Sequence, residues 1–121
     1  MKRETKIWRD KANRDFEVAK KLFDGGDYTY CSFWCQQAAE KALKALLLEK
    51  TGILIPTHDL VLLSKKLGAP YSIIYLCKEL SPVYMESRYP DVEEFREYTK
   101  EESETDLKNS NEILQWVEKN I

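Results

Sequence analysis

The only histidine in the chain, His58, is the first side chain to consider for proton-transfer chemistry. Histidine is the residue type best suited to act as a general acid or base near neutral pH. It stands in the segment Pro56-Thr57-His58-Asp59, where a helix is expected to begin. A lone histidine at a helix start is also typical of a capping or structural hydrogen-bonding residue, so the sequence leaves both roles open.

Arg88 is the second candidate, because it stands in a polar segment, Arg88-Tyr89-Pro90-Asp91, that must leave helical geometry. Pro90 disfavours helix at the residue before it and moves Tyr89 toward an extended conformation. Functional groups often gather at such junctions. The guanidinium of Arg88 could bind a phosphate through two parallel hydrogen bonds. Alternatively, it pairs with an acid of the following stretch while Tyr89 and Pro90 cover the end of the helices.

A third group of polar residues follows helical spacing. Gln37, Lys41 and Lys44 stand at steps of four and three and therefore share one face of a helix. One interpretation is a solvated stripe, in which Glu40 and Lys44 form an ordinary surface ion pair. The other is a cationic groove that accepts phosphate. Spacing alone does not choose between them.

Residue counts disfavour chemistry that needs a metal or a phosphate-binding loop. With one histidine and four glycines, the chain has neither a pair of metal-binding histidines nor a glycine-rich loop. A zinc site built from Cys31, Cys35, Cys77 and His58 would lack the usual close cysteine spacing. We therefore expect free, buried cysteines and predict no metal and no cofactor.

Helical periodicity dominates the elements that must position these residues, and no run alternates like a strand. Apolar side chains recur at three- and four-residue steps over about 4–24, 28–50 and 101–121. Gly25-Gly26 and Thr51-Gly52 end the first two segments, as glycine does at helix C-termini. Three long helices are therefore expected.

The middle of the chain predicts shorter helices. One is expected to open at Thr57 or His58 and to end near Gly68, and another runs from about Ser72 with an interruption at Pro82. Short connections between helices favour antiparallel neighbours. We predict an all-α fold, an antiparallel up-down bundle of four to five helices, as a single domain over 1–121 that pairs as a homodimer.

The charge distribution is uneven along the chain. Residues 1–50 carry 11 Lys and Arg against 8 Asp and Glu, whereas residues 91–121 carry 4 against 10. The overall net charge of −2 argues against strong, non-specific nucleic-acid binding. The sequence has no apolar run long enough to span a membrane and no signal peptide, so we expect a cytoplasmic protein.

Four motifs in order resemble the HEPN family over about Trp8 to Val117. These are Trp8 in the first amphipathic helix, the segment from Phe33 to Ala45 that contains Gln-Gln-Ala-Ala-Glu-Lys, the Thr57-His58-Asp59-Leu60 segment, and Ser87-Arg88-Tyr89-Pro90-Asp91. The resemblance implies an antiparallel helical bundle, usually a homodimer, that binds nucleotide or RNA. Many members pair with a minimal nucleotidyltransferase in toxin–antitoxin systems.

The same resemblance supplies the expected site. It places the family's polar positions at Gln37, Lys41, Lys44, His58, Arg88 and Tyr89, which we expect to line one cleft. The lysines and Arg88 would contact phosphate, Tyr89 would stack on a base, and His58 would bind phosphate or ribose. Some members are metal-independent ribonucleases that use an arginine followed four to six residues later by a histidine. No histidine follows Arg88, so the alternatives are a ribonuclease that uses His58 with Arg88 and a non-catalytic interaction protein.

Overall fold

Every regular element of the protein is a helix. The computed structural model describes residues 1–121 and contains no strand. The predicted all-α fold is therefore confirmed. The helices are α1 (Arg3–Asp24), α2 (Tyr28–Thr51), α3 (Leu60–Lys66), α4 (Tyr71–Leu80), α5 (Val83–Arg88) and α6 (Lys100–Asn120).

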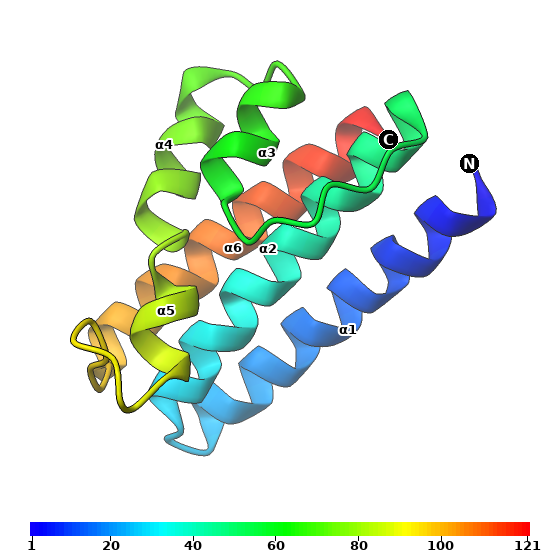
Figure 1. The fold of residues 1–121 in the computed structure, drawn as a ribbon. Coiled ribbons are helices and arrows are strands. Elements are labelled where there is room, and N and C mark those ends of the chain that lie inside the picture. Colours follow the sequence, from blue (N-terminus) through cyan, green and yellow to red (C-terminus); the bar gives the residue numbers. More distant parts are fainter.

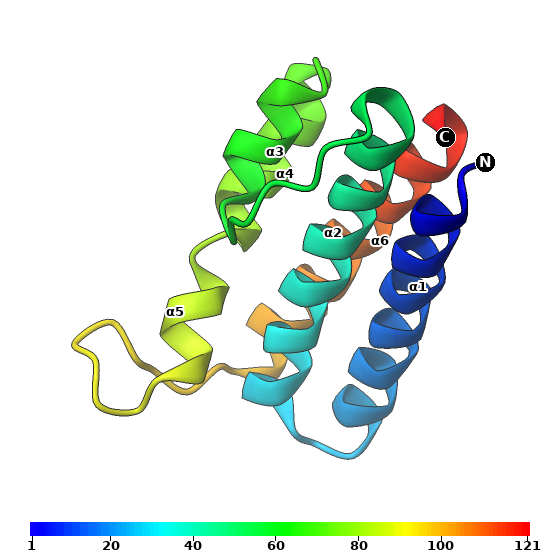
Figure 2. The same cartoon turned by 45° about the vertical axis from the view of Figure 1, so that its right-hand side comes forward.

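Three long helices form the body of the bundle. In Figure 1, α1 runs opposite to α2, and α6 runs beside α2 in the same direction as it. The shorter helices α3, α4 and α5 cover the remaining side of α2 and α6, and the two termini lie at the same end of the bundle (Figure 2). Helix α2 contacts α1, α3, α5 and α6, so it is the central element.

The central position of α2 follows from its composition. Small residues such as Ala38, Ala39 and Ala42 are almost fully buried, and they let neighbouring helices approach closely. Leu43 and Leu46 fill the space between those helices and are completely buried. No helix of the protein combines the length and apolarity that crossing a bilayer requires.

Pro82 divides the segment after α3 into two helices, as predicted. The Ser81 amide still donates to the Cys77 carbonyl oxygen, but proline has no amide proton to continue the pattern. Helix α5 then begins at Val83 and carries Tyr84 and Arg88 beside Phe33 of α2. Counted as one interrupted helix, α4 and α5 make the bundle five-helical, within the predicted range.

The start of α3 differs from the prediction. The helix begins at Leu60, because the Asp59 carboxylate accepts hydrogen bonds from the Val61 and Leu62 amides at 2.9 and 3.1 Å. His58 therefore stays outside the helix. A separate prediction is confirmed, since Cys31, Cys35 and Cys77 are free and buried.

Candidate functional site

A buried carboxylate on α2 organises the polar residues at the centre of the molecule. Glu40 is 4% exposed, and its two oxygens have different partners. Oε1 lies 2.9 Å from Nδ1 of His58, and Oε2 lies 3.0 Å from Nζ of Lys44. The interpretation of Glu40 and Lys44 as a solvated surface pair is therefore wrong. Helices packed around α2 cover both side chains.

Gln36 attaches the segment before α3 to this carboxylate. Its buried amide nitrogen donates to Oε1 of Glu40 at 3.3 Å and to the backbone oxygen of His58 at 3.2 Å. The amide of Gln37 in turn donates to Oε1 of Gln36 at 2.8 Å. His58 is thus held through both its ring and its backbone. Its Nε2 has no protein partner, and its side chain is 53% exposed.

Lys41 belongs to a second ion pair, made with a buried carboxylate of α1. Its Nζ lies 2.6 Å from Oδ2 of Asp15, and Nζ of Lys11 lies 2.9 Å from the other oxygen. Lys41 also donates to Gln37 at 3.3 Å and lies 5.8 Å from the centre of the Trp34 ring. Two ammonium groups share one carboxylate, so this cluster keeps one net positive charge.

Arg88 has no acidic partner. Its guanidinium carbon lies 5.0, 5.3 and 5.8 Å from the ring centres of Tyr84, Tyr89 and Phe33, distances at which a cation is attracted by aromatic faces. Nη1 donates to the Tyr84 hydroxyl oxygen. The alternative that Arg88 pairs with an acid of the following stretch is therefore wrong. The residue is exposed, and most of its donors are available to an anion.

Tyr84 connects the arginine with the histidine. The His58 ring stacks on the Tyr84 ring with centres 3.8 Å apart and planes 13° apart, while the Tyr84 hydroxyl accepts from Arg88 and lies 3.5 Å from that of Tyr89. Burial and the hydrogen bond with Tyr89 raise the pKa of Tyr84. Its hydroxyl therefore stays protonated at neutral pH.

Beside this network lies a cleft of about 600 Å³ between α2, α5 and the segment that follows α5. Four aromatic rings and one cation line it, and no carboxylate does. We call it the aromatic cleft. Its residues are Tyr30, Phe33, Trp34, Gln37, Ser87, Arg88, Pro90 and Phe95.

The six residues expected to form the site lie in one connected region. Gln37 and Arg88 line the aromatic cleft, and Lys41 contacts its Trp34 wall. Tyr89 packs behind Arg88. The other two predicted residues lie deeper in the network, because Glu40 joins Lys44 to His58.

Sequence reasoning did not assign site roles to five residues that the geometry makes central. Two of them line the aromatic cleft, and three hold the polar network. Helical spacing from Gln37 and Lys44 would have found two of them, because four-residue steps connect Phe33 to Gln37 and Glu40 to Lys44. The five residues are Phe33, Trp34, Gln36, Glu40 and Tyr84.

Comparison with known proteins gives a consistent assignment. The sequence-family model of the HEPN domain matches residues 5–120 of this chain. The crystal structure of TT1696 from Thermus thermophilus is 29% identical, with a TM-score of 0.90, over 99% of this chain and 100% of that one. ST0689, described as an archaeal HEPN homologue, is 32% identical with a TM-score of 0.81 over 98% of both chains. A HEPN domain protein of Thermotoga maritima, TM0613, is 25% identical with a TM-score of 0.75 over 93% and 95% of the two chains. The curated proteins include no match.

Proposed function

Because this chain belongs to the HEPN domain family, we propose that it binds a nucleotide or single-stranded RNA in the aromatic cleft. We propose further that it works as a homodimer with a minimal nucleotidyltransferase partner, in a system of the toxin–antitoxin type. A second subunit would extend the cleft. The partner and the homodimer rest on the family resemblance, whereas the binding site also rests on the geometry.

The composition of the aromatic cleft carries the binding proposal. A site for nucleic acid needs flat aromatic faces for bases and cations for phosphates. Phe33 and Trp34 offer such faces, and Arg88 offers a cation that no carboxylate neutralises. The absence of acidic side chains from the lining avoids repulsion of phosphate. These features together support a ligand that is both aromatic and anionic.

The geometry suggests different roles for the predicted residues. Arg88 would bind phosphate through its free donors, and Lys41 would add charge at the Trp34 wall. The side chain of Lys44 is only 7% exposed and is paired with Glu40, which supports a role in holding Glu40 rather than in contacting phosphate. Tyr89 packs against Arg88 and would orient the guanidinium instead of stacking on a base.

Arg88→Ala is expected to weaken binding of a short single-stranded RNA about 10- to 100-fold. Each charge-assisted hydrogen bond contributes about 1.5–3 kcal/mol, and the variant removes a phosphate fork. Fluorescence anisotropy at fixed salt measures the effect. Arg14→Ala is the matched control, because Arg14 is exposed on α1 and forms no ion pair. Equal affinities of both variants would refute binding by the cleft.

The contact of His58 and Arg88 with the same Tyr84 ring favours a ribonuclease as the second candidate. Glu40 holds Nδ1 of His58 and leaves Nε2 exposed, an arrangement that suits a general base. No histidine follows Arg88 in the sequence. In such a ribonuclease, His58 and Arg88 would therefore be brought together only by the tertiary structure. A third reading, a non-catalytic interaction protein, predicts neither RNA binding nor cleavage.

His58→Ala is expected to lower any RNA cleavage at least 100-fold, because a positioned acid or base contributes about 10²–10⁴ in rate. Gel analysis of a labelled RNA measures the rate, and RNA affinity is measured in parallel. Lys66→Ala, an exposed substitution at the end of α3, serves as control. Cleavage that persists in the His58 variant excludes this mechanism, since the chain has no other histidine.

A further inference from the structure

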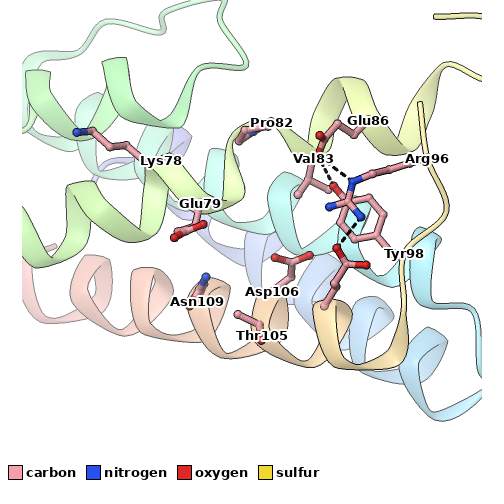
Figure 3. A pocket seen from close by; sticks show the side chains of 11 residues that line it. Lys78, Glu79, Pro82, Val83, Glu86, Arg96, Tyr98, Thr105, Asp106 and Asn109 are labelled. Atoms are coloured by element: carbon pink, nitrogen blue, oxygen red, sulfur yellow. Dashed lines mark hydrogen bonds and ion pairs between the residues drawn. The ribbon is translucent and has the colours of Figure 1, made fainter. Parts of the chain in front are cut away.

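A second cavity, of about 310 Å³, shares no residue with the aromatic cleft. It lies between α4, α5, α6 and the segment that precedes α6 (Figure 3). Four carboxylates and two cations are among its lining residues, and we call it the acidic cavity. The carboxylates are Glu79, Glu86, Glu102 and Asp106, and the cations are Lys78 and Arg96.

Asp106 is the unusual member of this set. It is 7% exposed, and its Oδ2 is buried without any hydrogen-bond partner. Figure 3 shows its carboxylate pointing from α6 into the cavity, toward the space between Glu79 and Tyr98. Buried carboxylate oxygens are almost always hydrogen-bonded, because desolvation without compensation is costly. Burial raises the pKa of Asp106 and the nearby Ser32 hydroxyl lowers it in part, but no protein donor lies within hydrogen-bond distance of Oδ2.

The cations in the lining do not supply such a donor. Arg96 pairs with Glu86 at 3.7 Å and with Glu102 at 2.6 Å, and its guanidinium lies 4.0 Å from the centre of the Tyr98 ring. Glu86 also accepts a hydrogen bond from the Tyr98 hydroxyl at 2.7 Å. These contacts hold Arg96 at one end of the cavity.

Lys78 is also directed elsewhere. Its Nζ lies 5.7 Å from the ring centre of Tyr71, and Figure 3 shows the ammonium turned away from Asp106. Asp106 and Glu79, which lies across the cavity on α4, are therefore left without a cationic partner. The lining therefore holds four carboxyl groups against two cations, and neither cation pairs with Asp106.

We propose that the acidic cavity binds a small organic cation carrying a primary ammonium or guanidinium group, with Asp106 as its main acceptor and Glu79 as its second. Such a group donates several hydrogen bonds, and its positive charge would favour the ionised form of Asp106. The hydroxyl of Thr105 and the amide of Asn109 provide further polar contacts in the lining. No group of three or more His, Cys, Asp or Glu side chains is arranged to hold a metal ion, which favours an organic cation.

Calorimetry with 1,4-diaminobutane tests this site, with 1,4-butanediol as the uncharged ligand of matched length. The diamine is expected to bind with Kd of about 1 mM or below, and the diol is not expected to bind. A second titration uses Nα-acetyl-lysine amide, which carries the same ammonium group as a lysine side chain of a protein partner. The relative affinities of the two cations then distinguish a free amine from a protein side chain as the source.

Asp106→Asn keeps the shape of the side chain and is expected to weaken diamine binding at least 10-fold. Glu79→Gln, at an exposed position, provides a second variant and is expected to weaken it to a smaller extent. Glu93→Gln, in the exposed segment after α5, and Arg88→Ala, in the aromatic cleft, are expected to leave the affinity unchanged. The proposal is overturned if neither cation gives saturable heat, if the diol binds equally well, or if neither cavity variant changes the affinity.

Discussion

Replacing Lys44 with methionine is expected to lower the free energy of unfolding by about 2–3 kcal/mol. The substitution keeps the volume of the aliphatic stem but leaves Glu40 buried without its cation. Breaking a buried ion pair from one side costs about 3–5 kcal/mol. We expect a smaller value here, because His58 and Gln36 still bind Oε1 of Glu40. Urea unfolding at pH 7 measures the change.

Removing the charge of Glu40 in the Lys44→Met variant tests whether the unpaired buried charge causes the loss of stability. In Glu40→Gln/Lys44→Met the amide oxygen still accepts from His58 and no buried charge remains, so at least half of the lost stability should return. Lys65→Met, an exposed substitution on α3, is expected to change the stability by less than about 0.5 kcal/mol. A double variant as unstable as Lys44→Met would show that packing, rather than the buried charge, is responsible.

Asp106→Asn is expected to stabilise the protein at high pH but not at low pH. Burial raises the pKa of Asp106 from its ordinary value of 3.8 to about 7. Between these values the folded protein binds more protons than the unfolded chain, so this group makes the wild-type protein less stable as the pH rises. The advantage of the variant should grow from near zero at pH 4 to about 2–4 kcal/mol at pH 8.

The difference between the two proteins isolates this group from other titrating residues. Urea titrations at several pH values measure it, and Asp91→Asn, in the exposed segment after α5, serves as control. A stability difference that does not change with pH would contradict the assignment. The titratable groups packed around Asp106 come from several elements. They are Cys31 and Cys35 on α2, Glu79 on α4, Glu86 on α5, Arg96 and Tyr98 in the following segment, and Glu102 on α6, while Lys78 lines the same cavity with its ammonium turned away.

The same substitution separates stability from binding. Asp106→Asn is expected to be more stable than the wild-type protein and to bind the diamine less tightly. A carboxylate that costs stability when it is unpaired is typical of functional sites, where groups are held ready for a ligand.

Most of the fold could be predicted from the sequence because helices depend on local patterns. Apolar residues at three- and four-residue steps indicated the long helices, and Gly25-Gly26, Gly52 and Pro82 marked where helices stop. The start of α3 was wrong by a few residues, because the Asp59 side chain caps the helix after His58. Helix boundaries depend on such individual hydrogen bonds, which periodicity does not resolve.

The candidate site was predicted only in outline. The resemblance named the residues, and spacing placed Gln37, Lys41 and Lys44 on one helix face. Helical spacing did not reveal that Glu40 and Lys44 are buried. Charged residues are usually exposed, and their burial depends on which other elements pack against that face of the helix. The pairing of Glu40 with His58 spans 18 residues, and that of Lys41 with Asp15 spans 26.

The sequence by itself therefore determined the helical class, the helix order and the residue types available for chemistry, because these follow from local spacing and composition. Tertiary structure alone decided which charged groups are buried and which of them pair between helices. Packing of α1 against α2 paired Lys41 with Asp15, and packing around α2 buried the Glu40–Lys44 pair, while Arg88 was left without a carboxylate. Packing of α6 also buried Oδ2 of Asp106 without a hydrogen-bond donor. Electrostatic roles depend on distance and desolvation, and both are set only when separate helices meet.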